Sequence, residues 1–317
     1  MLFGLSRRHL IGRCPSARSS RMVVAGLLGS LLMNACAGSS GPAAVPCPTG
    51  TVAVAAAENF WGSIAAQVGG TRVCVTSIIV NPDTDPHAYE AKPVDARLIA
   101  GAKYVIFNGA GYDPWAPKLL DANPVQGRSA LNIGDFLGRK EGDNPHLWYS
   151  PAFVDRVIDK IAADLAAADP QDAAYFDQQK SQYRTVGLKD YHDTINTIKD
   201  KYQGTPVGAS ESIFAYLAGA LALNLVTPPE YLKAISEGTD PSAADKATIQ
   251  EQISSRAIRV FVYNSQNSTP EVKALVAQAK ARGIPVSEVT ETLAPANLTF
   301  QDWQTDQLKR LLAALGG

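Results

Sequence analysis

The strongest constraint on the fold is an alternation of short β-type runs with amphipathic helical patterns, which occurs once in each half of the chain. In the first half the strand-like runs are Thr51–Ala56, Val73–Val80, Tyr104–Asn108 and Ser129–Ile133. In the second half they are Val207–Ala209, Ile258–Tyr263 and Ile284–Val289. Strands that alternate with helices predict parallel sheets with helices on both faces. We therefore expect an α/β protein of two parallel-sheet lobes.

The stretch between the two halves has a different pattern. A helical spacing of apolar residues runs from Val154 to Leu165 and stops at Asp169-Pro170. Residues 171–202 then form a long polar helical pattern without a proline. This predicts one long rigid helix that joins the lobes. The expected domains are an N-terminal lobe over 49–169, a linking helix over 170–202 and a C-terminal lobe over 203–317.

Residues 1–35 resemble a signal peptide of the lipoprotein type. Five arginines precede the apolar run Val23–Met33, and no acid occurs before Glu58. A basic segment followed by about 7–15 apolar residues is typical of a secretory signal and is too short to span a membrane. The run ends in a sequence that resembles a bacterial lipobox, in which Cys36 would be lipidated. A plain secretory signal with an incidental cysteine is the alternative, and Ser6–Ile11 also resembles a twin-arginine signal.

Cleavage before Cys36 would leave a Gly/Ser/Ala/Pro-rich tether over 36–48. Cleavage would also make the net charge more negative than the formal −1 of the full chain, because arginines are removed and no acidic residue is removed. Proteins that bind nucleic acid are expected to be basic, so nucleic acid is not an expected partner. One acyl chain would hold the protein at a membrane surface. We expect an extracytoplasmic, membrane-anchored lipoprotein, in the periplasm or at the cell surface, that is monomeric.

Two further cysteines remain after such processing. Cys47 and Cys74 would both face an oxidising compartment, where an unpaired couple tends to oxidise. We predict a disulfide between them, which would tie the start of the first strand to the second. A two-cysteine metal site is the alternative, but it lacks C-x-x-C spacing and neighbouring ligands.

Two of the three histidines of the processed chain share an unusual setting. His87 and His146 each follow a proline and precede an apolar residue and an aromatic one. Proline fixes its own φ and holds its predecessor extended, so both imidazoles should project from stiff loops. Either histidine alone would be interpreted as an ordinary loop residue, but the repeated frame favours two ligands of one metal ion. His192 lies on the polar helical stretch and is expected to be solvated.

Two acids of the second half follow strand-like runs in the same way. Glu211 comes just after Val207–Ala209, and Glu291 just after Ile284–Val289. Ligands of open parallel sheets bind beyond the carboxyl ends of the strands. Two imidazoles and two carboxylates that meet between the lobes could enclose a divalent transition metal, whose charge would offset the burial of the acids. The plainer alternatives are a first-turn helix acid for Glu211 and an exposed loop acid for Glu291.

Several motifs resemble those of the zinc/manganese-binding solute-binding lipoproteins of bacterial metal ABC importers. The resemblance covers essentially residues 50–315 and rests on the segments 85–90, 108–115, 144–148, 210–217, 240–242 and 290–294. It implies two α/β lobes joined by a long helix, with a metal between the lobes and an ABC permease as partner. It also implies that His87, His146, Glu211 and Glu291 are the ligands, although the last position is usually aspartate in the family.

The cargo implied by this resemblance is one divalent ion, Zn or Mn and possibly Fe, and the protein is expected not to be an enzyme. Zinc importers of the family often have histidine at the third position and a His/acid-rich loop, whereas this chain has Glu211 and no such loop, which is closer to the manganese or iron branch. A metal-dependent hydrolase of similar fold would need a metal-bound water and a separate general base. A surface adhesin or a carrier of a metal chelate is the third alternative, and a chelate would need a wide pocket.

Overall fold

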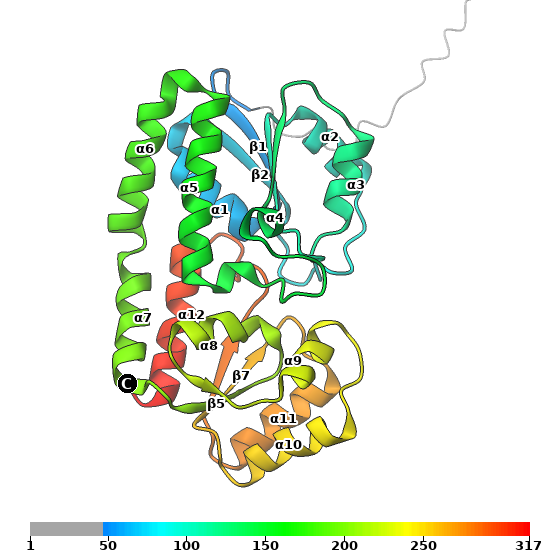
Figure 1. The fold of residues 1–317 in the computed structure, drawn as a ribbon, viewed down its shortest axis with the longest axis vertical. Helices are drawn as coiled ribbons and strands as arrows, with labels where there is room; N and C mark the ends of the chain where they lie inside the picture. The colour runs from blue at the N-terminus through cyan, green and yellow to red at the C-terminus, as the bar shows by residue number, and fades with distance from the viewer. Residues whose placement is uncertain (1–46) are drawn as a thin grey trace, which may run out of the picture. The chain divides into compact units, whose positions relative to one another are not determined.

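The computed structural model describes residues 47–317 (Figure 1). The expected signal peptide over 1–35, the lipidation site Cys36 and nearly all of the tether lie outside these residues. Within the described range no helix is long and apolar enough to cross a bilayer. The described chain contains two separate parallel sheets, one from each half of the sequence. The predicted two-lobe α/β architecture is therefore confirmed.

The N-terminal sheet has the strand order β2-β1-β3-β4, and all of its neighbouring strands are parallel. Its strands are β1 (Val52–Glu58), β2 (Val73–Ile79), β3 (Tyr104–Phe107) and β4 (Ser129–Asn132). Strand β1 is central, and Val54 pairs with Val75 on one side and with Tyr104 on the other. Nearly all of β1 and the whole of β3 are buried, as expected for strands covered on both faces.

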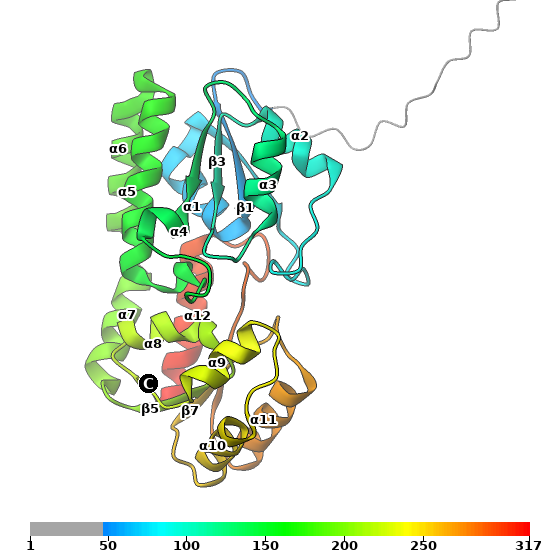
Figure 2. The ribbon, with the colours of Figure 1, turned by 45° about the vertical axis from the view of Figure 1, so that its right-hand side comes forward.

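Helices cover both faces of this sheet (Figures 1 and 2). They are α1 (Asn59–Gly69), α2 (Pro93–Gly101), α3 (Trp115–Ala122), α4 (Ile133–Leu137) and α5 (Pro151–Ala168), with short 3₁₀ turns at Gly70–Arg72 and Leu147–Tyr149. Helices α1 and α5 belong to the core cluster that holds Val54 and Ile106. Helices α2 and α3 belong to the opposite cluster, which holds Ala55 and Val105. Successive residues of one strand thus serve different faces.

The linking segment is helical as predicted, but it is not one uninterrupted α-helix. After a 3₁₀ turn at Pro170–Asp172 it consists of α6 (Ala173–Gln182), a π-helical turn over Tyr183–Gly187 and α7 (Lys189–Tyr202). Helix α6 packs on α1 and α5 of the N-terminal lobe, whereas α7 packs on the last helix of the chain. A π turn inserts an extra residue and so rotates the buried face between these two surfaces. Gly187 permits it, because a Cβ there would lie 2.7 Å from the Tyr183 ring.

The C-terminal sheet repeats the parallel arrangement in the order β6-β5-β7-β8. Its strands are β5 (Pro206–Ala209), β6 (Asn224–Leu225), β7 (Val260–Asn264) and β8 (Val286–Val289). Strand β6 is too short to give a sequence pattern and was not predicted. Strands β7 and β8 each begin two residues later than the apolar runs Ile258–Tyr263 and Ile284–Val289 suggested.

The helices of the C-terminal lobe begin largely where the sequence places their caps. They are α8 (Ala215–Ala220), α9 (Pro229–Ser236), α10 (Ala243–Ser254), α11 (Pro270–Ala281) and α12 (Phe300–Leu315), with a 3₁₀ turn at Ser212–Phe214. Ser242 caps α10 by accepting from the amide of Asp245 at 3.1 Å. Thr269 caps α11 in the same way, and Pro270 takes the first helical position.

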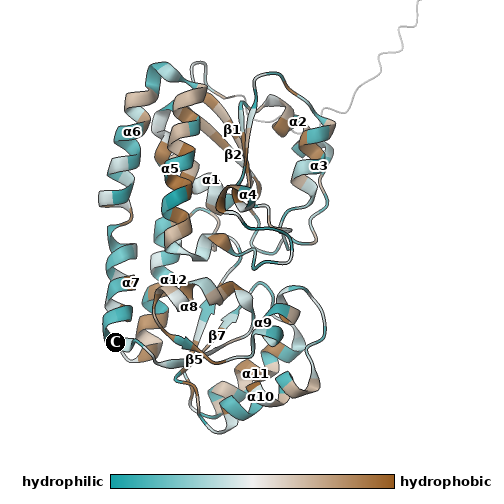
Figure 3. Ribbon diagram, viewed as in Figure 1, coloured by the Kyte–Doolittle hydropathy of each residue, from teal (hydrophilic) through white to brown (hydrophobic). Residues whose placement is uncertain are grey.

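Aromatic packing and the last helix join the two lobes. Phe60 of α1 stacks on Trp148 with ring centroids 4.0 Å apart, and Trp303 of α12 lies nearly parallel to Phe60 with ring centroids 6.5 Å apart. The Phe300 amide also donates to Ser63 Oγ at 2.8 Å. Figure 3 shows apolar residues concentrated on β1, β2 and α5, while α6 and α7 are largely hydrophilic. The polar loops that lie between the two sheets thus have a buried core of one lobe on either side.

The predicted disulfide between Cys47 and Cys74 is present. It joins the segment before β1 to the start of β2, at the amino ends of the strands. It therefore lies at the opposite edge of the sheet from the loops that carry the histidines.

Candidate metal centre

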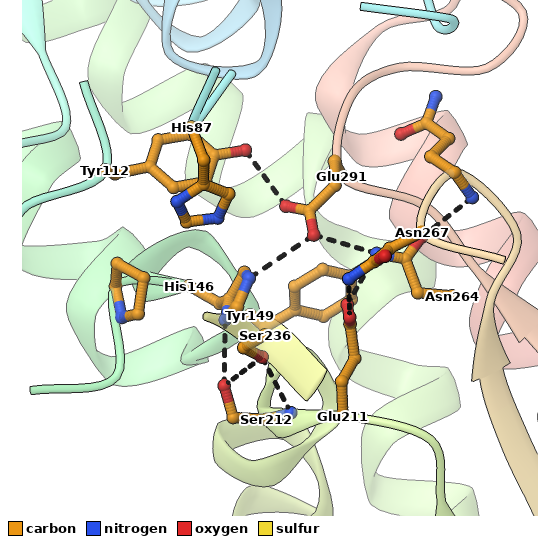
Figure 4. A network of polar contacts seen from close by, with 12 residues as sticks. His87, Tyr112, His146, Tyr149, Glu211, Ser212, Ser236, Asn264, Asn267 and Glu291 are labelled. Carbon is orange, nitrogen blue, oxygen red and sulfur yellow. Dashed lines mark hydrogen bonds and ion pairs between the residues drawn. The ribbon is translucent and has the colours of Figure 1, made fainter. Parts of the chain in front are cut away.

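Three of the four predicted ligands converge on one point. One ligand atom each of His87, His146 and Glu291 lie within 4.8 Å of one another. These residues come from loops of both lobes, after β2, after α4 and after β8 (Figure 4). The convergence follows from the two parallel sheets, whose carboxyl ends face each other across the lobes.

His146 is prepared to donate a lone pair. Its side chain is fully buried, and Nδ1 lies 2.7 Å from Oδ1 of Asn144. The amide nitrogen of Asn144 already donates to the carbonyl of Ser212 at 2.7 Å, so Oδ1 must accept and Nδ1 must carry the proton. Nε2 has no hydrogen-bond partner within residues 47–317 and lies 3.3 Å from Oε1 of Glu291. Burial lowers the pKa of His146 to about 4, so the ring is neutral at pH 7.

His87 is the exposed member of the group. Its backbone amide donates to Oδ1 of Asp85 at 2.9 Å, which fixes the turn around the buried Pro86. Its ring packs edge-on against Tyr112, with ring centroids 4.6 Å apart. Desolvation in this setting lowers the pKa of His87, and the neighbouring Glu291 carboxylate opposes that shift. His87 is thus placed between solvent and the buried side chains of His146 and Glu291.

Glu291 is buried and accepts a hydrogen bond on each oxygen. The hydroxyl of Tyr112 donates to Oε2 at 2.9 Å, and Nδ2 of Asn264 donates to Oε1 at 2.8 Å. Burial raises the pKa of Glu291, while His87 pulls it down. A buried carboxylate of this kind is costly unless a cation compensates it.

Glu211 is adjacent to this group but not part of it. It is 1% exposed, and both of its oxygens are held by side-chain amides. Asn264 donates to Oε1 at 2.5 Å, and Asn267 donates to Oε2 at 2.6 Å. Burial, with a smaller contribution from Glu291, raises the pKa of Glu211 to about 8. The structure therefore assembles His87, His146 and Glu291 directly and keeps Glu211 one shared amide away.

A cavity of about 290 Å³ opens beside the convergent group. Residues of both lobes line it, among them Asp85 and His87 from one and Glu237, Asn267 and Glu291 from the other. Its wall carries more acidic than basic side chains, which suits the approach of a cation. An ion bound by the three residues would thus be reached from solvent past His87.

The hydrogen-bonding partners of the predicted ligands were missed by sequence reasoning. Asn264, Asn267, Asn144 and Tyr112 have no spacing in the sequence that marks them as such partners. One signal was present, since Asn264 ends β7 just as Glu211 and Glu291 follow β5 and β8. His192 lies on α7 and is not in the convergent group, as expected.

Two imidazoles and a carboxylate are a donor set that divalent zinc and related transition metals accept. Nitrogen donors favour a borderline-soft ion such as Zn(II), whereas carboxylates also suit Mn(II). The site therefore combines the preferences of both metals.

The chain is similar over most of its length to known metal-binding proteins. It is 21% identical over 244 residues to the high-affinity zinc uptake system protein ZnuA of Bacillus subtilis, covering 71% of this chain and 73% of that protein. It is 23% identical over 242 residues to the manganese-binding lipoprotein MntA of the same organism, covering 74% of this chain and 78% of that protein.

Solved structures share the fold. A Mn-bound periplasmic metal binding protein from Candidatus Liberibacter asiaticus has a TM-score of 0.69 at 22% identity, covering 84% of this chain and 99% of that one. A laminin-binding adhesin from Streptococcus agalactiae, a mutant structure, has a TM-score of 0.66 at 18% identity, covering 83% and 99%. The family described as zinc-uptake complex component A, periplasmic, matches residues 54–314, and the chain belongs to it.

Proposed function

We propose that this protein captures a divalent transition metal outside the cytoplasm and delivers it to the permease of an ABC importer. Its family is one of metal-binding substrate-binding proteins and not of enzymes. The ion is cargo in this proposal, and no chemistry is performed on it. The proteins it resembles are named for zinc in one case and for manganese in another.

The observation that carries the proposal is the geometry at His146. Its Nε2 is fully buried, has no hydrogen-bond partner within the described chain and points at Glu291 Oε1, 3.3 Å away. A neutral imidazole nitrogen and a carboxylate oxygen left this close in the interior are a pair that a bound cation would complete. His87, on the cavity side, would close the set.

We propose His87, His146, Glu211 and Glu291 as the ligands. Glu211 would join through a small shift of its side chain, using the free lone pair of an oxygen that keeps its amide partner. Glutamate at position 291 is longer than the aspartate usual in the family. Tyr112 and Asn264 hold both oxygens of this longer side chain in place.

The cellular setting follows from the N-terminal segment and the family. Relatives are named lipoproteins or periplasmic proteins. We propose a monomeric lipoprotein anchored through Cys36, with residues 36–48 as its tether. Metabolic labelling with a fatty acid would test the anchor, since Cys36→Ala should abolish incorporation of the label.

The function is tested by measuring metal binding directly. Metal-free protein should bind one equivalent of Zn(II) or Mn(II) in calorimetry, and protein purified from its host should carry metal. A strain that lacks the protein should grow poorly when the metal that the protein carries is limiting. It should grow normally when only the other metal is limiting. Absence of any binding of Zn(II), Mn(II) and Fe(II) would overturn the proposal.

A metal-dependent hydrolase and a chelate carrier were the rival functions. A hydrolase activity does not fit a family of metal-binding substrate-binding proteins. Metal-dependent turnover of a small ester or phosphate would be needed to support it. The cavity of about 290 Å³ leaves room beside the ligands, but its acidic wall disfavours an anionic chelate.

A further inference from the structure

Asn264 hydrogen-bonds to both glutamates from the end of a central strand of the C-terminal sheet. Strand β7 runs between β5 and β8, and Asn264 is its last residue. Glu211 follows β5 and Glu291 follows β8, so the asparagine stands between the two acids. Its side chain is fully buried, and Nδ2 donates to Oε1 of Glu211 at 2.5 Å and to Oε1 of Glu291 at 2.8 Å.

The remaining two carboxylate oxygens are held in the same manner. Asn267 donates to Oε2 of Glu211 at 2.6 Å, and Tyr112 donates to Oε2 of Glu291 at 2.9 Å. All of these donors are neutral amides or a hydroxyl. No lysine or arginine within residues 47–317 forms an ion pair with either glutamate. The two acids are thus oriented without a fixed cation that would repel a metal (Figure 4).

This arrangement limits how each acid can bind an ion. A carboxylate oxygen has two lone pairs, and one on each oxygen is already used. Bidentate binding needs the free lone pairs of both oxygens to converge on one ion, so the carboxylate must turn toward it, and donors that hold both oxygens oppose that turn. The arrangement therefore favours binding through one oxygen of each glutamate, which keeps the number of protein ligands low. Zinc accepts four ligands, whereas manganese prefers more oxygen donors in an octahedral arrangement.

We propose that Asn264 is a positioning residue that sets metal selectivity: by holding both glutamates to one ligand oxygen each, it raises the preference of the site for Zn(II) over Mn(II). This inference rests on the proposed metal-binding function. Asn267 reinforces the effect at Glu211 alone, because it reaches only that acid among the proposed ligands.

The test compares the Zn(II)-to-Mn(II) affinity ratio of the wild-type protein with that of Asn264→Ala and Asn264→Asp. The alanine frees both Oε1 atoms, and the aspartate keeps the shape of the side chain while replacing the donor by an acceptor. The ratio should fall at least ~10-fold in both, because replacing a residue that orients ligands typically changes metal affinity by about 10–100-fold. Asn267→Ala should shift it in the same direction by less. Gln252→Ala is the matched control, since it removes an amide in the same lobe that donates to the carbonyl of Val226.

A spectroscopic readout separates positioning from a general loss of structure. Co(II) bound to the wild-type protein should show the intense visible bands of a low-coordinate ion, and these should weaken in the Asn264 variants as more oxygens bind. If Asn264→Ala does not fold, Asn267→Ala and Asn264→Asp carry the same test. An unchanged ratio and unchanged Co(II) bands, or an equal loss of both affinities, would overturn the inference while leaving the proposed function intact. Failure of the wild-type protein to bind either metal would overturn both.

Discussion

Nε2 of His146 lies 3.3 Å from Oε1 of Glu291, although the two residues lie in loops of different lobes. The contact depends on Asn144, which fixes the imidazole tautomer, and on Asn264, which fixes the carboxylate. Both lobes must therefore be in place before the site exists. The aromatic packing that joins the lobes holds them in place, and its residues Phe60, Trp148 and Trp303 are all nearly inaccessible.

Replacement of either histidine by alanine should weaken metal binding. His87→Ala and His146→Ala each remove a nitrogen donor, and we expect at least ~10-fold weaker Zn(II) binding, equivalent to about 1.4 kcal/mol. Calorimetry on metal-free protein measures the change. His192→Ala serves as control because that residue lies on α7 outside the convergent group. Wild-type affinity in both site variants would remove these histidines from the site.

The isolated protein should bind Zn(II) more tightly than Mn(II), whatever its cargo in the cell. Imidazole donors suit zinc, and the Irving–Williams order places manganese lowest among the divalent first-row metals. Competition calorimetry, in which Zn(II) is titrated into the Mn(II)-loaded protein, gives the ratio directly. A higher affinity for Mn(II) would contradict this expectation.

Asn144→Ala should impair metal binding although Asn144 is not a proposed ligand. The substitution removes the acceptor of the His146 Nδ1 proton and the contact to the Ser212 carbonyl. Replacing the hydrogen-bond partner of a ligating histidine typically weakens metal binding about 10–100-fold, because the partner orients the ring and fixes its tautomer. Nitrogen NMR of labelled histidine should show a mixture of tautomers in the variant. Asn123→Ala, which removes an amide bonded to the Leu119 carbonyl, should bind as wild type does.

A buried acid pair near the site predicts a pH dependence of stability. Glu58 is fully buried, and burial together with Asp113 raises its pKa well above 4.5. Neither carboxylate oxygen of Glu58 has a hydrogen-bond partner within residues 47–317, and the Asp113 carboxylate holds the amides of Asn108 and Gly109. Because the folded-state pKa of Glu58 is raised, its contribution to the free energy of unfolding is complete at low pH and is lost as pH rises. The unfolded chain releases the proton from about pH 4.5 upward.

Glu58→Gln isolates this effect, since glutamine mimics the protonated acid and does not titrate. Relative to wild type, the variant should gain free energy of unfolding as pH rises from about 4.5 toward 8. Denaturant unfolding of metal-free wild type and variant across that range measures the difference and cancels the titration of the ligands. A difference that does not change with pH would show that Glu58 is ionised in the folded protein.

The sequence was most informative where a pattern is local. The individual strands follow from such local patterns. So do the stiff loops around His87 and His146, because each depends on residues close together in the chain. The π turn at Tyr183–Gly187 could not be seen, because one inserted residue hardly alters the spacing of apolar positions. Strand β6 was not predicted, because two residues are too few to show a periodicity.

By itself, the sequence determined the two α/β lobes and the disulfide and predicted a set of candidate donor residues, because these follow from periodicity, redox chemistry and position after strands. Only the tertiary structure decided which donors meet. His87, His146 and Glu291 converge, while Glu211 is held aside by Asn264 and Asn267. The reason is that a hydrogen bond of less than 3 Å depends on strand order and lobe packing, which bring residues more than 50 positions apart into contact.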